Sequence, residues 1–198
     1  MDIGDLEPDP LAELGRQLET ARAAGAPLPE AMAVATRGPD GDPALRMVIM
    51  RGLDTGLVFY TDRESDKGED LAAYPRAAAL FHWWVPIHRQ VRAVGAVSLV
   101  SEAESDAYWA SRPPGSRRSA IASRQSRVVE SREFLVAAVA AAQERYPDET
   151  AIVRPERWGG YRITPESVEF WEEGPDRLHD RIRYRRVGEE WVRERLSP

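Results

Sequence analysis

The stretch RMVIMRGLDTGLVFYT, residues 46–61, contains two runs of strand-forming residues separated by a turn. The runs 46–50 and 57–61 are rich in β-branched and aromatic residues, and Asp54-Thr55-Gly56 between them is typical of a turn. A further short strand is predicted at 31–36, before a second turn in the sequence PDGDP at 39–43. Three strands joined by short turns predict an antiparallel meander.

The same pattern of strands and insertions continues to the end of the chain. We expect further strands at 77–84, 90–100, 160–163, 167–171, 181–187 and 191–196, with a hairpin turn at 187–190. Helices are expected at about 10–24, with Asp9 as N-cap and Gly25 at its end, at 66–74, at 101–111 behind a Ser101/Glu104 capping box, and at 131–146. Residues 112–115, RPPG, are expected to be a loop. Strands outnumber helices, which favours a barrel with helical insertions over a doubly wound sheet.

Composition narrows the function classes. The chain has 198 residues, 42% of them hydrophobic, which fits one domain, residues 1–198. Its acidic start and the lack of a long apolar run predict a cytoplasmic protein without a membrane partner. A net charge of −6 disfavours nucleic-acid binding. No cysteine is present and the three histidines are scattered, so no metal site is expected.

Lys67 is the single lysine among 27 basic residues. Base-composition bias in the source genome is one explanation, and a site that requires a compact point charge is the other. The chain has no nucleophile motif, no P-loop and no Gly-x-Gly-x-x-Gly turn. An enzyme with this inventory would take its chemistry from a cofactor.

Three clusters of residues are candidates for anion binding. Arg46 and Arg51 bracket a strand and are followed by Tyr60, Thr61 and Lys67, a set that could hold a phosphate or could form an ordinary solvated strand edge.

The second cluster is Tyr108, Arg112 and Ser116, which suits an oxyanion, although cations at a helix end also cap the helix. The third is Trp171 with Arg177 and His179, which fits a planar anionic ligand or a charged turn before an edge strand.

Taken in order, these clusters resemble the pyridoxamine 5'-phosphate oxidases and the related oxidases of phenazine biosynthesis. The resemblance runs from about residue 9 to residue 198. Its most specific segments are RMV at 46–48, VFYT at 58–61, RQV at 89–91, SRP at 111–113, SRQS at 123–126, WGGYR at 158–162, VEFW at 168–171, RLHDR at 177–181 and the terminal RLSP.

The resemblance implies a fold and a cofactor. The fold would be mainly β with α insertions, a six-stranded antiparallel split barrel that forms a homodimer with FMN between the subunits. The strands at about 158–198 would serve dimerisation and substrate binding. FMN would contact Arg46, Met47, Val48, Ile49, Tyr60, Thr61, Lys67 and Gln90 of one subunit. Gln125, Ser126, Trp171 and Arg181 would complete the FMN site, partly from the other subunit.

The resemblance also implies a reaction. The substrate, a small aromatic anion, would contact Arg51, Tyr108, Arg112 and Ser116, with Arg177 and His179 over its ring as the catalytic residues. A hydride would pass from the substrate to FMN, and O2 would reoxidise the flavin and give hydrogen peroxide. The leading substrate is pyridoxamine or pyridoxine 5'-phosphate.

Four departures from the vitamin B6 enzymes keep alternatives open. Arg51 stands where those enzymes usually place a lysine, Asp66 stands where they carry a second cation, and Ser119-Ala120-Ile121 replaces a Gly-Ala-Trp stretch. The segment 82–88 before Arg89-Gln90 is one residue longer than the usual loop. The alternatives are a phenazine-type oxidase of a dihydroaromatic carboxylic acid and a flavin-binding protein without catalysis.

Overall fold

Nine strands form one antiparallel sheet in the computed structural model, which describes residues 1–198. The strands are β1 (Ala31–Arg37), β2 (Pro43–Ile49), β3 (Gly52–Leu53), β4 (Leu57–Asp62), β5 (Arg76–Trp83), β6 (Arg89–Leu99), β7 (Trp158–Glu172), β8 (Asp180–Val187) and β9 (Glu190–Arg195). The helices are α1 (Pro10–Ala23), α2 (Asp66–Ala73), α3 (Glu102–Ser111), α4 (Pro114–Ala122) and α5 (Arg132–Arg145). Short 3₁₀ turns cover Ile3–Asp5, Glu149–Ala151 and Pro175–Arg177.

The strand order is β2-β1-β5-β6-β7-β4-β3, with β8 added to β7 and β9 to β8. One edge of β7 pairs with β6, whereas its other edge pairs with β4 over 158–163 and with β8 over 167–172. The sheet therefore divides along β7. The predicted mainly β architecture with helical insertions is confirmed, but the meander predicted over residues 31–61 is wrong, because β4 pairs with β7 and not with β2. The sheet as a whole holds nine strands, more than the six expected of the barrel.

The two strands predicted at 160–163 and 167–171 are one long strand, β7. Pro165 interrupts the sequence pattern of a strand, but a bulge absorbs the interruption. The register between β6 and β7 shifts at Val94/Gly95, which leaves Glu166 unpaired. Gly95 is required there, because a Cβ atom would lie 1.9 Å from the carbonyl oxygen of Thr164.

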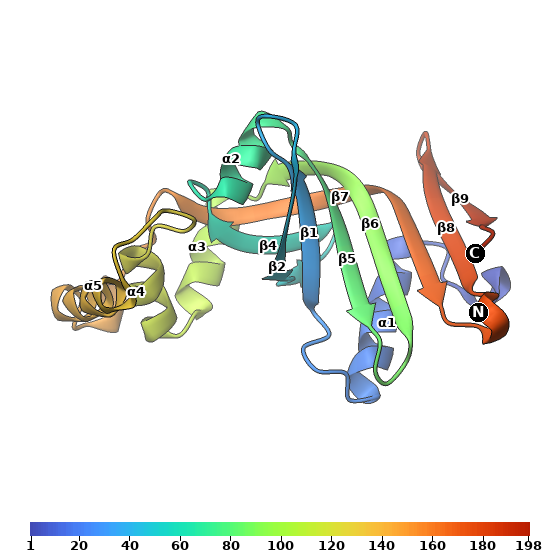
Figure 1. Ribbon diagram of the computed structural model, residues 1–198, viewed down its shortest axis with the longest axis horizontal. Coiled ribbons are helices and arrows are strands. Elements are labelled where there is room, and N and C mark those ends of the chain that lie inside the picture. Colours follow the sequence, from blue (N-terminus) through green and yellow to red (C-terminus); the bar gives the residue numbers. More distant parts are fainter.

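One face of β1, β5 and β6 forms the main core. Met32, Phe81 and Val91 are almost fully buried on that face, and Leu14 and Leu18 of α1 belong to the same cluster. Figure 1 shows α1, β8 and β9 toward one end of the molecule and α3, α4 and α5 toward the other. None of the helices has the length and apolar character that crossing a lipid bilayer requires.

Helix boundaries follow the sequence except at one point. The Asp9 side chain accepts a hydrogen bond from the Leu11 amide (2.9 Å), and Gly25 adopts φ 83° just after α1. The capping box is also present, since Ser101 and Glu104 exchange hydrogen bonds. The loop predicted over 112–115 is wrong in extent, because α4 already begins at Pro114. Proline is well suited to the first helical position, where its missing N–H costs nothing.

Candidate functional site

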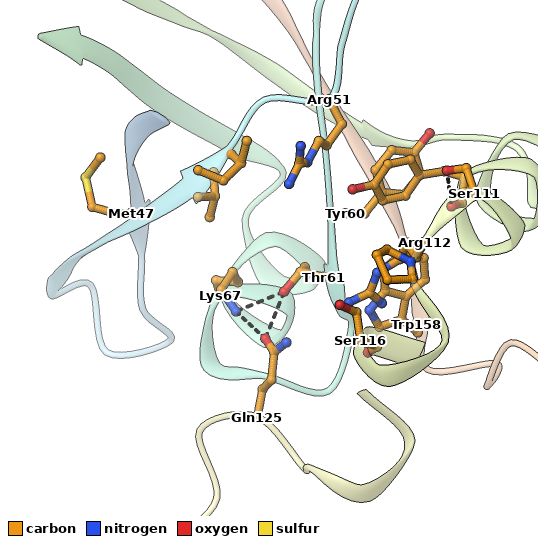
Figure 2. A pocket seen from close by; sticks show the side chains of 14 residues that line it. Met47, Arg51, Tyr60, Thr61, Lys67, Ser111, Arg112, Ser116, Gln125 and Trp158 are labelled. Atoms are coloured by element: carbon orange, nitrogen blue, oxygen red, sulfur yellow. Dashed lines mark hydrogen bonds between the residues drawn. The ribbon is translucent and has the colours of Figure 1, made fainter. Parts of the chain in front are cut away.

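A cleft of about 720 Å³ lies where β2 and β4 meet α2, α3 and α4 (Figure 2). Seven of its lining residues were predicted for FMN: Met47, Val48, Ile49, Tyr60, Thr61, Lys67 and Gln125. Four were predicted for the substrate: Arg51, Tyr108, Arg112 and Ser116. The remaining three are Ser111, Pro113 and Trp158. The volume falls within the usual range for small-molecule sites, about 300–1,000 Å³.

The Lys67 ammonium forms one end of the cleft. It donates hydrogen bonds to the side-chain oxygens of Thr61 (3.0 Å), Ser65 (2.9 Å) and Gln125 (2.9 Å). All three acceptors are neutral, and Lys67 makes no ion pair. Figure 2 shows Thr61 and Gln125 converging on the Lys67 nitrogen. The ammonium is therefore held in place with its charge uncancelled.

The electrostatics of Lys67 agree with this arrangement. Burial and the neighbouring Arg46 guanidinium lower the pKa of the Lys67 ammonium, partly offset by the carboxylates of Asp62, Asp66 and Asp70. A charged group that is partly desolvated and lacks a carboxylate partner gains most from an anionic ligand. This end of the cleft is suited to a phosphate.

Arg112 lies at the other end. Its Nη2 donates to the Ser116 carbonyl (3.2 Å), its Nη1 is buried without a hydrogen-bond partner, and burial lowers its pKa. Figure 2 places the guanidinium against Trp158, across the cleft from Lys67. An arginine with a spare donor can accept a second anionic group at this end.

Three aromatic rings line one wall between these ends. Tyr60 stacks on Tyr108 with ring centroids 4.0 Å apart, and Trp158 lies nearly parallel to both rings, at 5.7 and 6.0 Å. Burial raises the pKa of Tyr60, which keeps the phenol neutral. Parallel rings beside two cations provide a wall for a planar anionic ligand.

The cleft has no acidic lining residue, although the chain as a whole carries a net charge of −6. Arg51, the third cation, makes no side-chain hydrogen bond or ion pair, and Figure 2 shows its guanidinium directed into the cleft. Many other arginines are paired, as Arg162 is with both Asp54 and Glu104. Positive charge is thus left free at this cleft.

Some predicted FMN residues are placed differently. Arg46 does not line the cleft, since its guanidinium is bonded to Thr36, the Val34 carbonyl and Asp70. Within the chain, the Arg46 guanidinium places a second positive charge near Lys67 and lowers the pKa of the Lys67 ammonium. Ser126 also lies outside the lining, and its hydroxyl accepts a hydrogen bond from the Asp66 amide (3.3 Å). Asp66 is exposed and forms no ion pair with Lys67.

The remaining predicted residues form a second cluster at the other end of β7. Gln90 pairs with Trp171, and Trp171 pairs with Arg181 on β8. The His179 ring lies 4.6 Å from Trp171. The buried carboxylate of Glu169 holds Arg181 by an ion pair (2.8 Å). Within one chain this cluster contributes nothing to the cleft lining.

Arg177 is the exposed member of this second cluster. Asp176 and Arg177 both have positive φ, 52° and 64°, which non-glycine residues seldom adopt. Such strain is common where a side chain must be presented to a ligand. Gln125, in contrast, lies beside Lys67 of its own chain and lines the cleft.

Of the lining residues that the sequence did not assign, Trp158 matters most. It lies in the WGGYR segment that carries part of the resemblance. The sequence alone does not show whether this tryptophan lines a site or belongs to the core. Only the fold brings it beside Tyr60 of β4, because Trp158 pairs with Asp62 at the start of β7. No group of three histidine or acidic side chains in the structure could hold a metal ion.

Comparisons with known proteins agree over nearly the whole chain. Residues 18–146 match the family model of pyridoxamine 5'-phosphate oxidase. Residues 158–198 match the model described as the pyridoxine 5'-phosphate oxidase C-terminal dimerisation region. The pyridoxine/pyridoxamine 5'-phosphate oxidase of Burkholderia cenocepacia (strain HI2424) is 48% identical over an alignment of 202 residues, which covers 100% of this chain and 93% of the relative.

Two solved structures are similar in fold. PhzG from Burkholderia lata 383, in complex with tetrahydrophenazine-1-carboxylic acid, has a TM-score of 0.92 and 34% identity, and the match covers 98% of this chain and 95% of PhzG. A pyridoxamine 5'-phosphate oxidase-related, FMN binding protein from Nostoc punctiforme has a TM-score of 0.78 and covers 98% of this chain and 100% of its own. At 20% identity, the second likeness concerns the fold alone.

Proposed function

The chain belongs to the pyridoxamine 5'-phosphate oxidase family, and from this premise we propose that it is an FMN-dependent oxidase of pyridoxamine or pyridoxine 5'-phosphate. One observation of the structure carries the proposal. The cleft presents three cations, Arg51, Lys67 and Arg112, and no carboxylate. Two anionic groups, the phosphate of a cofactor and that of a substrate, match the two ends of such a cleft.

The residues at the Lys67 end fit FMN. Its ammonium lacks an anionic partner, and the Gln125 and Thr61 side chains hold it from two sides. Lys67 would bind the phosphate, and Met47, Val48 and Ile49 would face the ring system. The chemistry that bound FMN would supply is acceptance of a hydride from the carbon that bears the substrate amine or alcohol, with reoxidation by O2 to give hydrogen peroxide. The chain itself supplies position and charge.

At the other end, Arg112, Tyr108 and Ser116 would bind the substrate phosphate. The Arg112 guanidinium has no carboxylate partner, and the Ser116 hydroxyl is a donor that a phosphate oxygen can accept from. Arg51 extends over the same space and would neutralise the second charge of the phosphate. Fixing the phosphate in this way would orient the substrate ring for the reaction.

A second copy of the chain is part of this proposal. The face of β2, β1, β5 and β6 that points away from the core carries Leu45, Ala35, Ala78 and Val94 in one row across the strands. Met47, Ala33 and Leu80 begin the next row, which ends with Arg92 on β6. Leu45 is 70% exposed and Met47 63%. Met47 also lines the cleft, so this apolar face is continuous with the site, and its burial by a second copy would enclose the cleft.

The same second copy would complete the site. Trp171, Arg177, His179 and Arg181 lie apart from the cleft of their own chain. We infer that the second copy brings this cluster to the cleft, with Trp171 and Arg181 at the flavin. Arg177 would stabilise an anionic substituent of the substrate ring, and His179 would orient the ring. The strained backbone at Arg177 supports its presentation to a ligand.

A second candidate function is the oxidation of a dihydroaromatic carboxylic acid, as in phenazine biosynthesis. The 34% identity to PhzG, which was solved with a tetrahydrophenazine carboxylic acid, favours it. The 48% identity to the B. cenocepacia pyridoxine/pyridoxamine 5'-phosphate oxidase favours the vitamin B6 phosphates more strongly. Arg112 could bind either a carboxylate or a phosphate.

A substrate panel on FMN-loaded protein tests the proposal. O2 uptake with pyridoxamine 5'-phosphate, and much less with unphosphorylated pyridoxamine, is the expected result. Turnover of a dihydrophenazine carboxylate without turnover of the vitamin B6 phosphates would replace the first candidate by the second. Flavin binding without turnover of any member of the panel would indicate a binding protein, and failure to take up FMN would remove all three.

A further inference from the structure

The guanidinium of Arg112 rests on an aromatic surface instead of on a carboxylate. Its Cζ atom lies 4.7 Å from the ring centroid of Trp158 and 5.3 Å from that of Trp109. Both distances are within the range of cation–π attraction. The only hydrogen bond of this guanidinium within the chain runs from Nη2 to the Ser116 carbonyl. Stacking on the indole is therefore the main contact that fixes where Arg112 points.

Trp158 is itself rigid. It is 3% exposed, and its ring meets Trp109 edge to face at 4.8 Å. Trp109 is anchored in turn by a hydrogen bond from its Nε1 to the Ile152 carbonyl (2.9 Å). The backbone of Trp158 is fixed by its pairing with Asp62 on β4. A ring that is held by an anchored neighbour and by strand pairing can impose one orientation on a flexible arginine.

An arginine that packs on an aromatic ring keeps its charge and its N–H donors unpaired, whereas an ion pair with a carboxylate uses both. Arg162 is held by the carboxylates of Asp54 and Glu104, which use its donors and cancel its charge. A ring face holds the guanidinium plane without using an N–H donor. Arg112 thus keeps its charge free of any carboxylate, and its Nη1 forms no hydrogen bond within the chain.

We propose that Trp158 is a positioning residue, which holds the Arg112 guanidinium in the orientation that binds the phosphate of the substrate. This inference rests on the proposed function, because it assumes that a phosphate binds at Arg112. Trp158 acts through Arg112. Its removal should weaken the binding of phosphorylated ligands far more than that of their unphosphorylated counterparts.

The probes are 4-deoxypyridoxine 5'-phosphate and 4-deoxypyridoxine, which cannot be oxidised at the reacting carbon, titrated calorimetrically into FMN-loaded protein. For Trp158→Leu we expect the dissociation constant of the phosphate ester to rise about tenfold and that of the alcohol to rise much less. Trp158→Phe retains a smaller ring face and should lose about threefold. In turnover of pyridoxamine 5'-phosphate, Trp158→Leu should raise KM and leave kcat nearly unchanged.

Two controls separate positioning from packing. Ile152→Ala removes an equally buried side chain of the same small cluster and should lower the melting temperature without changing phosphate affinity. In a cycle with Arg112→Ala, the double variant should bind the phosphate ester no more weakly than Arg112→Ala alone. Additive losses would overturn the inference, as would an unchanged phosphate preference in a folded Trp158→Leu protein.

The outcomes also separate this inference from the proposed function. A wild-type protein that binds both probes equally well would overturn the phosphate assignment and the inference with it. A wild-type protein that prefers the phosphate ester, beside a Trp158→Leu protein with the same preference, would overturn the inference alone. If Trp158→Leu loses cooperative unfolding, Trp158→Phe decides, since a threefold loss supports the inference and no loss contradicts it.

Discussion

Replacing Lys67 by methionine should separate the stability of the fold from the binding of FMN. Methionine keeps an unbranched side chain one atom shorter than that of lysine and removes the charge. In the free protein the ammonium contacts three neutral oxygens and no carboxylate. Burial is the main cause of its lowered pKa, so the fold disfavours the charged form relative to water. We expect the free energy of unfolding of the FMN-free variant to change by no more than about 1 kcal/mol, because the three hydrogen bonds that are lost are offset by removal of the desolvation cost of the buried charge.

FMN binding should respond strongly. A hydrogen bond to a charged group contributes about 1.5–3 kcal/mol, which corresponds to roughly a 10- to 100-fold rise in the dissociation constant of FMN. The assay is quenching of flavin fluorescence, with the melting temperature of the FMN-free protein measured in parallel. Unchanged FMN affinity would refute the assignment of Lys67 to the phosphate. A large loss of stability in the FMN-free variant would show that Lys67 has a structural role instead.

The lowered pKa of Lys67 also predicts a pH dependence. The folded protein releases this proton more readily than the unfolded chain, whose lysine titrates near the ordinary value of 10.5. The cost of the buried charge to stability is therefore present at neutral pH and is relieved as pH rises through the lowered pKa toward 10.5. FMN affinity should fall over the same rise. Lys67→Arg should abolish that fall, because arginine remains charged.

Three further substitutions test other parts of the account. Arg177→Ala should leave FMN binding nearly intact, because this side chain would contact the substrate only. Turnover, measured as O2 uptake, should fall at least tenfold. An unchanged rate would show that Arg177 has no role in the reaction. Leu45→Glu places a charge on the exposed apolar sheet face. The variant should be monomeric in analytical ultracentrifugation and should bind FMN more weakly. A dimer that is unaltered by this substitution would place the interface elsewhere. Gly95→Ala should lower the free energy of unfolding, measured with denaturant, by about 1–3 kcal/mol, because the added Cβ would collide with the Thr164 carbonyl. Gly4 lies in open space, so Gly4→Ala should leave the free energy of unfolding unchanged. Equal effects of the two substitutions would contradict the bulge geometry.

Local chemistry made much of the fold predictable. The turn at 54–56 and the capping box at Ser101 depend on contacts within a few residues, and both are present. The continuity of β7 depends on a bulge opposite Gly95, a contact between residues about seventy positions apart in the chain. A pattern read along the sequence meets Pro165 and predicts a break there. The start of α4 at Pro114 was not predicted, because a Pro-Pro-Gly sequence is as typical of a loop as of a helix start.

The residue types of the site could be predicted from the sequence, but much of its geometry could not. Lys67, Arg112 and Tyr60 were all expected to bind ligands, and the fold brings them to one cleft. The sequence did not reveal that Asp70 and Thr36 engage Arg46, because those contacts depend on how α2 packs against β1. Nor did it reveal the place of Trp158, which becomes a wall of the cleft only when β4 and β7 pair.

The central claim is that this cleft holds FMN and that a vitamin B6 phosphate reduces it there. An anaerobic titration of the FMN-loaded protein with pyridoxamine 5'-phosphate tests it most directly, with the absorbance of oxidised flavin as the readout. We expect one equivalent of substrate to bleach the flavin, and pyridoxamine without the phosphate to do so far more slowly. A flavin that stays oxidised with pyridoxamine 5'-phosphate, yet is bleached by a dihydrophenazine carboxylate, would contradict the claim.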